Sequence, residues 1–188
     1  MAVGKSEIET KIIGINPKDV REALKKAGAA YVGKFRLKMI LFSMKGDGSS
    51  RINLRLRNDG KKAYLTLKDW DLKKRKSPYE YETEVADFKT GAAILAKLFG
   101  RPAYTEKARE IYKLGRAEIV IDKYADLPYY MEIEAPSERE VMRTYGTIGK
   151  PGKIFGNFPT GKLYEHYGVD RKKHNKELEW KLDKLLKA

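Results

Sequence analysis

The sequence predicts an α+β fold in which an eight-stranded antiparallel sheet closes into a β-barrel, or tunnel, with helices packed outside it. Eight segments alternate polar with apolar residues or form longer β-like runs, and alternation with a period of two is typical of half-buried strands. Short turn signals such as Asn58-Asp59-Gly60 separate several of these segments, as they do in antiparallel hairpins. Each strand is therefore expected to present one apolar and one charged face.

The predicted strands all lie between Glu7 and Glu134. Six of them show the alternation, and two are longer β-like runs. In chain order they cover Glu7–Ile13, Tyr31–Met44, Ile52–Arg57, Tyr64–Lys68, Tyr79–Val85, Tyr104–Leu114, Glu118–Asp122 and Tyr130–Glu134.

Helix signals interrupt the strands twice and dominate the end of the chain. Asn16, followed by Pro17 in the first turn, and Asp87 are N-cap residues, while Gly28 and Gly100 end the two helices. Further helices are expected over Ser137–Tyr145, Lys162–Tyr167 and Arg171–Leu186, with a Gly- and Pro-rich loop over Gly146–Gly161. We expect one domain over residues 1–188, with the barrel over about 5–136 and a helical C-terminal extension and lid over about 137–188.

The composition excludes several kinds of site and location. The chain has 188 residues and no cysteine, so disulfides and thiolate zinc sites are excluded. Its longest apolar stretches, such as Met39 to Phe42, are too short to cross a bilayer, and its N-terminus carries no apolar segment of signal-peptide type. We therefore expect a cytoplasmic protein with no membrane partner.

The charge balance favours anionic partners. The net charge of +14 comes from 40 Lys and Arg against 26 Asp and Glu, and it attracts nucleotides, polyphosphates, RNA or acidic surfaces without choosing among them. One short basic run, Lys73 to Lys76, is interpreted as a solvated loop.

Residues two apart in a strand share a face, so the alternation also predicts which charged side chains lie together. An open sheet with this face toward solvent is the alternative, but it would be expected to carry more Ser, Thr, Asn and Gln and fewer paired carboxylates. Burying so many charges in a tunnel is costly unless ligands compensate them. The predicted charged residues are Glu7, Glu9, Lys11, Arg55, Arg57, Lys68, Glu80, Glu82, Glu84, Lys107, Arg109, Glu118, Asp122, Glu132 and Glu134.

The two signs of charge suit two parts of one ligand. Carboxylate oxygens are hard ligands that suit Mg²⁺ or Mn²⁺, while Lys and Arg match phosphate oxygens. Together with a metal, the basic residues could neutralise a polyphosphate that carries about four negative charges. These basic residues are Lys11, Arg55, Arg57, Lys68, Lys107 and Arg109.

In their order along the chain, these residues resemble the CYTH family, also called the triphosphate tunnel metalloenzymes, which includes class IV adenylyl cyclases, thiamine triphosphatases and inorganic triphosphatases. Glu7-Ile8-Glu9-Thr10-Lys11 matches the N-terminal E-x-E-x-K signature of that family. The resemblance covers roughly Glu7 to Glu134. The further matches, in family order, are Arg55 with Arg57, Thr66 with Lys68, Glu82 with Glu84, Lys107 with Arg109, Asp122, and Glu132 with Glu134.

The resemblance implies a tunnel whose acidic first and last strands hold Mg²⁺ or Mn²⁺ while the basic residues hold the phosphates. It implies catalytic roles for Glu7, Glu9, Lys11, Glu132 and Glu134. The implied metal ligands are Glu7, Glu9, Glu132 and Glu134, with Asp122 or Glu84 nearby, and Glu80 and Glu82 are additional acidic candidates because the register of their strand is open.

We predict a divalent-metal-dependent triphosphatase that acts on inorganic triphosphate, ATP or another nucleoside triphosphate. A class IV adenylyl cyclase that makes cyclic AMP from ATP is an alternative, because it needs the same contacts to the phosphates. A non-catalytic polyanion- or RNA-binding protein is a further alternative, but it gives no reason for the paired carboxylates, so nucleic acid is not the expected partner. The second strand reads Phe35 to Phe42 where family members often carry an aromatic Y-F-D pattern. The non-phosphate end of the substrate stays open, as does the formation of a homodimer.

One further motif matches the start of a P-loop but is not interpreted as one. Residues Gly156 to Lys162 fit the G-x-x-x-x-G-K start of a P-loop, but Leu163 follows where a Ser or Thr would bind Mg²⁺. Pro159 also removes a backbone N–H, and no parallel βαβ pattern surrounds the segment. We interpret it as a surface loop or a lid.

Overall fold

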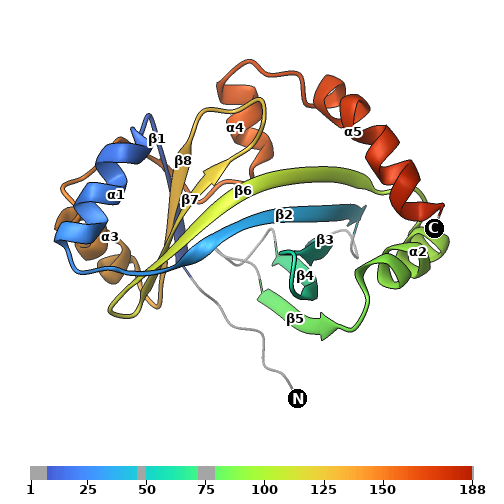
Figure 1. The fold of residues 1–188 in the computed structure, drawn as a ribbon, viewed down its shortest axis with the longest axis horizontal. Coiled ribbons are helices and arrows are strands. Elements are labelled where there is room, and N and C mark those ends of the chain that lie inside the picture. The colour runs from blue at the N-terminus through green and yellow to red at the C-terminus, as the bar shows by residue number, and fades with distance from the viewer. Residues whose placement is uncertain (1–7, 46–49, 72–78, 188) are drawn as a thin grey trace. The chain divides into compact units, whose positions relative to one another are not determined.

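The structure of the chain, a computed structural model, describes residues 8–45, 50–71 and 79–187. All eight predicted strands and all five predicted helices form (Figure 1). No helix among the described residues is both long and apolar enough to cross a membrane. The elements are β1 (Ile8–Ile13), α1 (Pro17–Lys26), β2 (Ala30–Lys45), β3 (Ser50–Asn58), β4 (Ala63–Asp71), β5 (Tyr79–Val85), α2 (Phe88–Phe99), β6 (Ala103–Leu114), β7 (Ala117–Lys123), β8 (Tyr130–Ala135), α3 (Glu138–Thr147), β9 (Lys153–Gly156), α4 (Gly161–His166) and α5 (Arg171–Leu186).

The sheet corrects the prediction of a closed eight-stranded barrel. Among the described residues it has nine strands, because β9 forms inside the predicted loop Gly146–Gly161 and pairs antiparallel with β1. The hydrogen-bonding order β5-β4-β3-β2-β6-β7-β8-β1-β9 starts and ends on different strands, so it is open. Four residues are too few for β9 to show a clear alternation. Alternation shows to which face of the sheet each side chain points, but it does not show whether the two edge strands pair with each other and close the sheet.

The chain divides into two compact units. Unit 1 is formed by the described residues of Arg36–Glu106 and Asp170–Ala188, and unit 2 by those of Glu7–Phe35 and Lys107–Val169. Strands β2 and β6 contribute residues to both. Each unit has its own cluster of buried apolar side chains. The assignment of residues 1–188 to a single domain stays a prediction.

In unit 1, α2 and α5 lie side by side and pack on the apolar residues of the strands (Figure 1). Helix α2 begins where the side chain of Asp87 accepts a hydrogen bond of 2.6 Å from the backbone N–H of Thr90. Its buried Leu95 and the buried Leu182 of α5 belong to the same cluster as Leu56 of β3. The leucines Leu178, Leu182 and Leu185 of the last helix therefore pack within unit 1.

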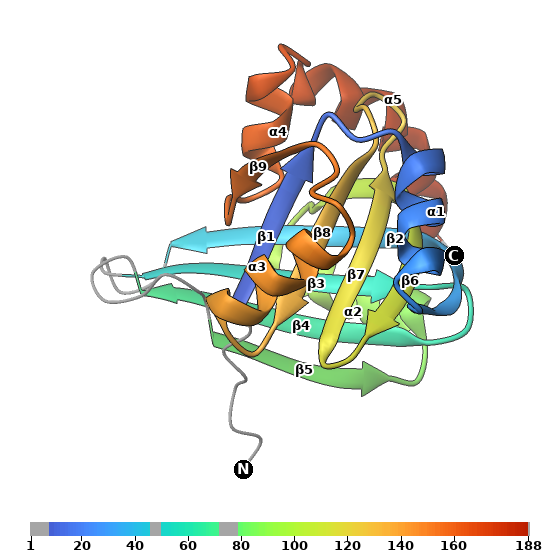
Figure 2. The same cartoon turned by 90° about the vertical axis from the view of Figure 1, so that its left-hand side faces the viewer.

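In unit 2, α1 and α3 cover one face of β1, β8 and β7 (Figure 2). Asn16 and Ser137 cap the two helices, because their side chains accept hydrogen bonds from the backbone N–H groups of Lys18 and Glu140. The buried cluster contains apolar residues of both helices and of these strands. The opposite face of the strands is therefore left for the alternating polar residues.

Gly152, just before β9, has a close contact that requires glycine. Its φ is +72°, and a Cβ at this position would lie 2.3 Å from the carbonyl oxygen of Ile13. A side chain would therefore both strain the backbone and push β9 away from β1.

We predict that Gly152→Ala lowers the free energy of unfolding by about 2 kcal/mol or more. The matched control is Gly146→Ala, because Gly146 lies inside α3 with open space around it, and alanine favours a helix by about 0.5–1 kcal/mol over glycine. Urea denaturation of the two variants checks this. Equal stability of Gly152→Ala and wild type would show that β9 does not pack as described.

Candidate functional site

One face of the unit 2 strands collects predicted site residues from four strands. Directly opposite residues of antiparallel strands point to the same side, and Glu9 lies opposite Glu134 while Lys11 lies opposite Glu132. Arg109 lies opposite Asp122 in the same way. We use the name charged face of unit 2 for the following seven residues: Glu9, Lys11, Lys107, Arg109, Asp122, Glu132 and Glu134. Glu7, the remaining predicted ligand, lies outside the described residues.

Arg109 and Asp122 form the centre of this face. The guanidinium of Arg109 donates two hydrogen bonds to the Asp122 carboxylate, of 2.8 Å from Nε and 2.6 Å from a terminal nitrogen. It donates a third, of 2.9 Å, to Glu132. Asp122 is fully buried, and its second cation is Lys107, whose Nζ lies 2.6 Å from Oδ2. Arg109 thus joins two carboxylates of neighbouring strands.

Lys11 extends the network to β1. Its Nζ donates to Glu9 at 2.6 Å and lies 3.2 Å from Glu132, and the side chain is only 3% exposed. The attached Glu9 side chain is 25% exposed. The network therefore runs from a partly open carboxylate on β1 to the buried pair of β6 and β7.

The network keeps its acids and bases ionised. Burial alone would raise the pKa of Glu132, but the charges of Lys11, Lys107 and Arg109 hold that pKa well below its usual value. Burial would likewise raise the pKa of Asp122, and Arg109 and Lys107 lower it. For Lys11, burial acts to lower the pKa, but Glu132 and Glu9 raise it above its usual value.

Lys107 is the exception among these groups. Burial, followed by repulsion from Arg109, lowers the pKa of Lys107 to about 8, despite the attraction of Asp122 and Glu132. Its Nζ lies 5.5 Å from the centre of the Tyr124 ring. An additional anion beside Lys107 would favour the charged form and raise this pKa.

The lowered pKa of Lys107 makes stability depend on alkaline pH. The folded pKa of about 8 lies below the ordinary value of 10.5, so the unfolded chain binds more protons between these values and folding gains stability as pH rises. We predict that the free energy of unfolding of wild type, relative to Lys107→Met, increases by about 1–3 kcal/mol between about pH 7.5 and about pH 10.5. Urea denaturation at a series of pH values measures it. A relative stability that is flat or decreases over this range would contradict the lowered pKa.

Unit 1 has a charged face of its own. Arg55 lies opposite Thr66, which lies opposite Glu82. The register thus resolves the open question about the acidic strand, because all three of its glutamates share one face with the cations. We use the name charged face of unit 1 for the following six residues: Arg55, Arg57, Lys68, Glu80, Glu82 and Glu84.

The ion pairs on the unit 1 face are more exposed than those in unit 2. The hydroxyl of Thr66 donates to Glu82 at 2.7 Å, and Arg57 lies 3.5 Å from the same carboxylate. Lys68 pairs with Glu80. The Nε of Arg55 is buried and has no hydrogen-bond partner within the described part of the chain. A buried donor of this kind fits an anionic oxygen.

Glu84 lies at the end of the unit 1 face and pairs with a lysine outside the predicted site. Its carboxylate accepts a bond of 2.8 Å from Lys62, and both side chains are more than half exposed. An exposed pair of this kind contributes little to stability. Its carboxylate therefore stays open to other ligands.

The carboxylates of unit 2 fit a divalent metal in their chemistry. Glu9 and Glu134 face each other across β1 and β8, and carboxylate oxygens suit Mg²⁺ or Mn²⁺. Asp122 and Glu132 already bond to cations. Within residues 8–45, 50–71 and 79–187, no three Asp, Glu or His side chains cluster closely enough to hold an ion by themselves. Glu9 likewise bonds to Lys11, so a metal held between Glu9 and Glu134 would share the Glu9 carboxylate with that lysine.

Tyr130 lies on the same side of the sheet as the charged face of unit 2, although a tyrosine in a strand is usually assigned to packing. It lies opposite Asp122 and is 1% exposed. Its ring stacks on that of Tyr124 with a centroid separation of 6.4 Å and an interplanar angle of 4°. Burial raises the pKa of Tyr130 well above its ordinary value, so its hydroxyl stays protonated. In the sequence, Tyr130 is separated from Glu132 and Glu134 by even numbers of positions, which in a strand places the three side chains on one face.

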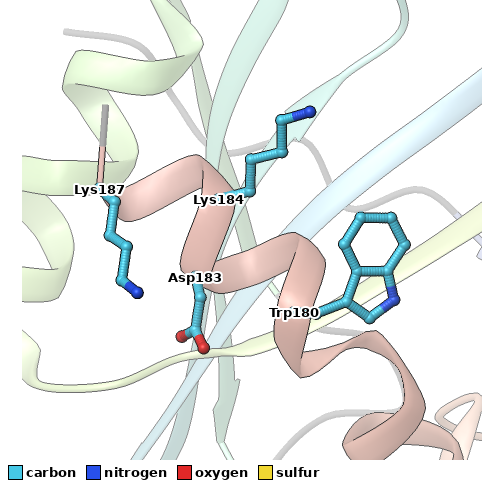
Figure 3. Close-up of a pocket in the computed structure, with 4 residues that line it drawn as sticks. All are labelled: Trp180, Asp183, Lys184 and Lys187. Carbon is cyan, nitrogen blue, oxygen red and sulfur yellow. The ribbon is translucent and has the colours of Figure 1, made fainter.

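A surface pocket on α5 contains none of the predicted site residues. Trp180, Asp183, Lys184 and Lys187 line it (Figure 3). Trp180 is 62% exposed, so it does not anchor the helix in a core. Asp183 pairs with Arg101 at 2.8 Å. None of the residues that line this pocket belongs to either charged face.

The fold is an open antiparallel sheet with two charged faces, and comparison with known proteins identifies the family. Residues 5–145 match the CYTH domain, so the chain belongs to the CYTH family. This confirms the resemblance seen in the sequence. None of the curated proteins compared with the chain matches it.

Solved structures agree with this fold. A protein from Pyrococcus horikoshii OT3 is similar with 23% identity and a TM-score of 0.64, covering 76% of this chain and 90% of its own. A candidate adenylate cyclase from Vibrio parahaemolyticus has 14% identity and a TM-score of 0.58, covering 77% of this chain and 85% of its own. A candidate adenylyl cyclase from Hippeastrum, described as having a dominant triphosphatase activity, has 13% identity and a TM-score of 0.55, covering 87% and 96%. At these identities the likeness concerns the fold.

Proposed function

We propose that this chain is a divalent-metal-dependent triphosphatase that hydrolyses inorganic triphosphate or a nucleoside triphosphate. The observation that carries the proposal is the buried network on the charged face of unit 2, where carboxylates hold Lys11, Lys107 and Arg109 in place. Membership of the CYTH family supports a triphosphate as the substrate. The activity described for the Hippeastrum protein supports hydrolysis.

The cations are proposed to bind the phosphates. Lys11, Lys107 and Arg109 are at most 14% exposed, and hydrogen bonds from charged donors to phosphate are strong in such surroundings. Their bonds to carboxylates fix their positions before a ligand arrives, which lowers the cost of reorganisation during reaction. Arg55, Arg57 and Lys68 of unit 1 are proposed as further phosphate ligands.

The carboxylates are proposed to hold the metal. Family membership supports dependence on a divalent ion, and Mg²⁺ or Mn²⁺ would stabilise charge on the phosphoryl group and lower the pKa of an attacking water. Glu7, Glu9, Glu132 and Glu134 are the proposed ligands, with Glu84 as a further candidate. Asp122, whose two oxygens both bond to cations, is proposed chiefly to position Lys107 and Arg109.

The test is phosphate release from inorganic triphosphate and nucleoside triphosphates, with and without Mg²⁺ or Mn²⁺. We predict metal-dependent release of orthophosphate by wild type and a loss of at least about 100-fold in Glu9→Gln. Glu9 makes its bond at a partly exposed site, so the melting temperature should change little. Glu165→Gln is the matched control, because Glu165 is 66% exposed on α4.

The products separate the alternatives. Cyclic AMP and pyrophosphate from ATP would mark an adenylyl cyclase, the activity named for the Vibrio protein. Metal-independent, salt-sensitive RNA binding without phosphate release would replace the proposal by a polyanion-binding function. Full activity of Glu9→Gln would contradict the role given to the carboxylates.

A further inference from the structure

The hydroxyl of Tyr130 is a buried donor with no hydrogen-bond partner among the residues that the structure describes. The side chain is 1% exposed. Tyr130 lies on β8 two residues before Glu132 and directly opposite Asp122 of β7. It therefore belongs to the face that carries the ion-pair network, and not to the face covered by α1 and α3.

The packing of the ring does not account for this hydroxyl. Tyr130 stacks on Tyr124, and a phenylalanine would make the same ring contact without burying a polar group. An unsatisfied buried hydroxyl costs about 1–3 kcal/mol of stability. Such a group in a folded protein needs another explanation, and a ligand is one.

The neighbouring groups favour an anionic ligand. The Nζ of Lys107 lies 5.5 Å from the centre of the Tyr124 ring that stacks on Tyr130. The carboxylate of Asp122, opposite Tyr130, accepts its hydrogen bonds from Lys107 and Arg109. Lys107 and Arg109 both bond to the residue directly opposite Tyr130. The two cations and the Tyr130 side chain therefore share one part of the charged face, where the Tyr130 hydroxyl has no acceptor among the described residues.

We infer that the Tyr130 hydroxyl is a positioning group that donates a hydrogen bond to a phosphoryl oxygen of the bound triphosphate. This inference rests on the proposed function and adds a residue that the family signature does not contain. A neutral hydroxyl adds direction without adding another positive charge beside Lys107 and Arg109. Hydrogen bonds from O–H to an anionic oxygen are short and strong, so one such bond restricts the orientation of the phosphate.

The test compares Tyr130→Phe with Tyr145→Phe in the full chain. The hydroxyl of Tyr145 donates a hydrogen bond of 2.9 Å to the carbonyl oxygen of Gly152, on the side of the sheet covered by α3. Isothermal titration with inorganic triphosphate gives the affinity, and thermal unfolding gives the melting temperature. We predict about tenfold weaker binding for Tyr130→Phe, with a melting temperature equal to or above that of wild type. Tyr145→Phe should melt lower and bind as wild type does.

The outcomes distinguish this inference from the proposed function. If wild type binds triphosphate and Tyr130→Phe binds equally well, the inference is wrong and the proposed function stands. If Tyr130→Phe binds weakly but also melts lower, the hydroxyl has a structural role and the inference is again wrong. If wild type itself does not bind triphosphate, both fail together.

Discussion

The charged face of unit 2 depends on the guanidinium of Arg109. Arg109 bonds to Asp122 and to Glu132, and each of these carboxylates holds a lysine, Lys107 in one case and Lys11 in the other. A single planar group thus links two lysine–carboxylate pairs, and only arginine has the fork of donors that this requires. Buried charges are tolerated when they are paired and hydrogen-bonded, so removing this link would leave two carboxylates in apolar surroundings with one cation fewer.

The apolar side of the same strands makes the network possible. Residues of α1 and α3 cover it and complete the buried cluster, which fixes the strands that carry the ionised groups. Glu110 is a buried acidic residue on that side, and Arg21 satisfies it with bonds of 2.8 and 2.9 Å. The charged face of unit 2 is therefore built on regular strands, whose positions are more constrained than those of loops.

Alternation predicted the strands and their faces because the side-chain direction in a strand depends only on local sequence. It placed Glu9 with Lys11 and Glu132 with Glu134 correctly, and the helix caps Asn16 and Asp87 followed from equally local signals. The strand register depends on pairing across the sheet, so the position of Glu82 opposite Thr66 could not be predicted from one strand alone. Tyr130 was missed because an aromatic residue in a strand is normally assigned to packing, and its unsatisfied hydroxyl is visible only in three dimensions.

The strand β9 and the open order of the sheet show the same limit. Lys153–Gly156 pairs with β1 because Gly152 allows a close approach that no periodic pattern encodes. Closure of a sheet is a property of its edges, and the faces of its strands carry no information about it. The chemistry of the charged faces was thus predictable from sequence, whereas the contacts within each face needed the structure.

Calorimetric titration of Arg109→Gln with inorganic triphosphate measures whether Arg109 organises a surface that binds triphosphate. Binding should weaken by at least about 100-fold relative to wild type, while Arg143→Gln, a change on α3 outside the charged face, leaves the affinity unchanged. A folded Arg109→Gln variant that binds triphosphate as tightly as wild type would contradict the account.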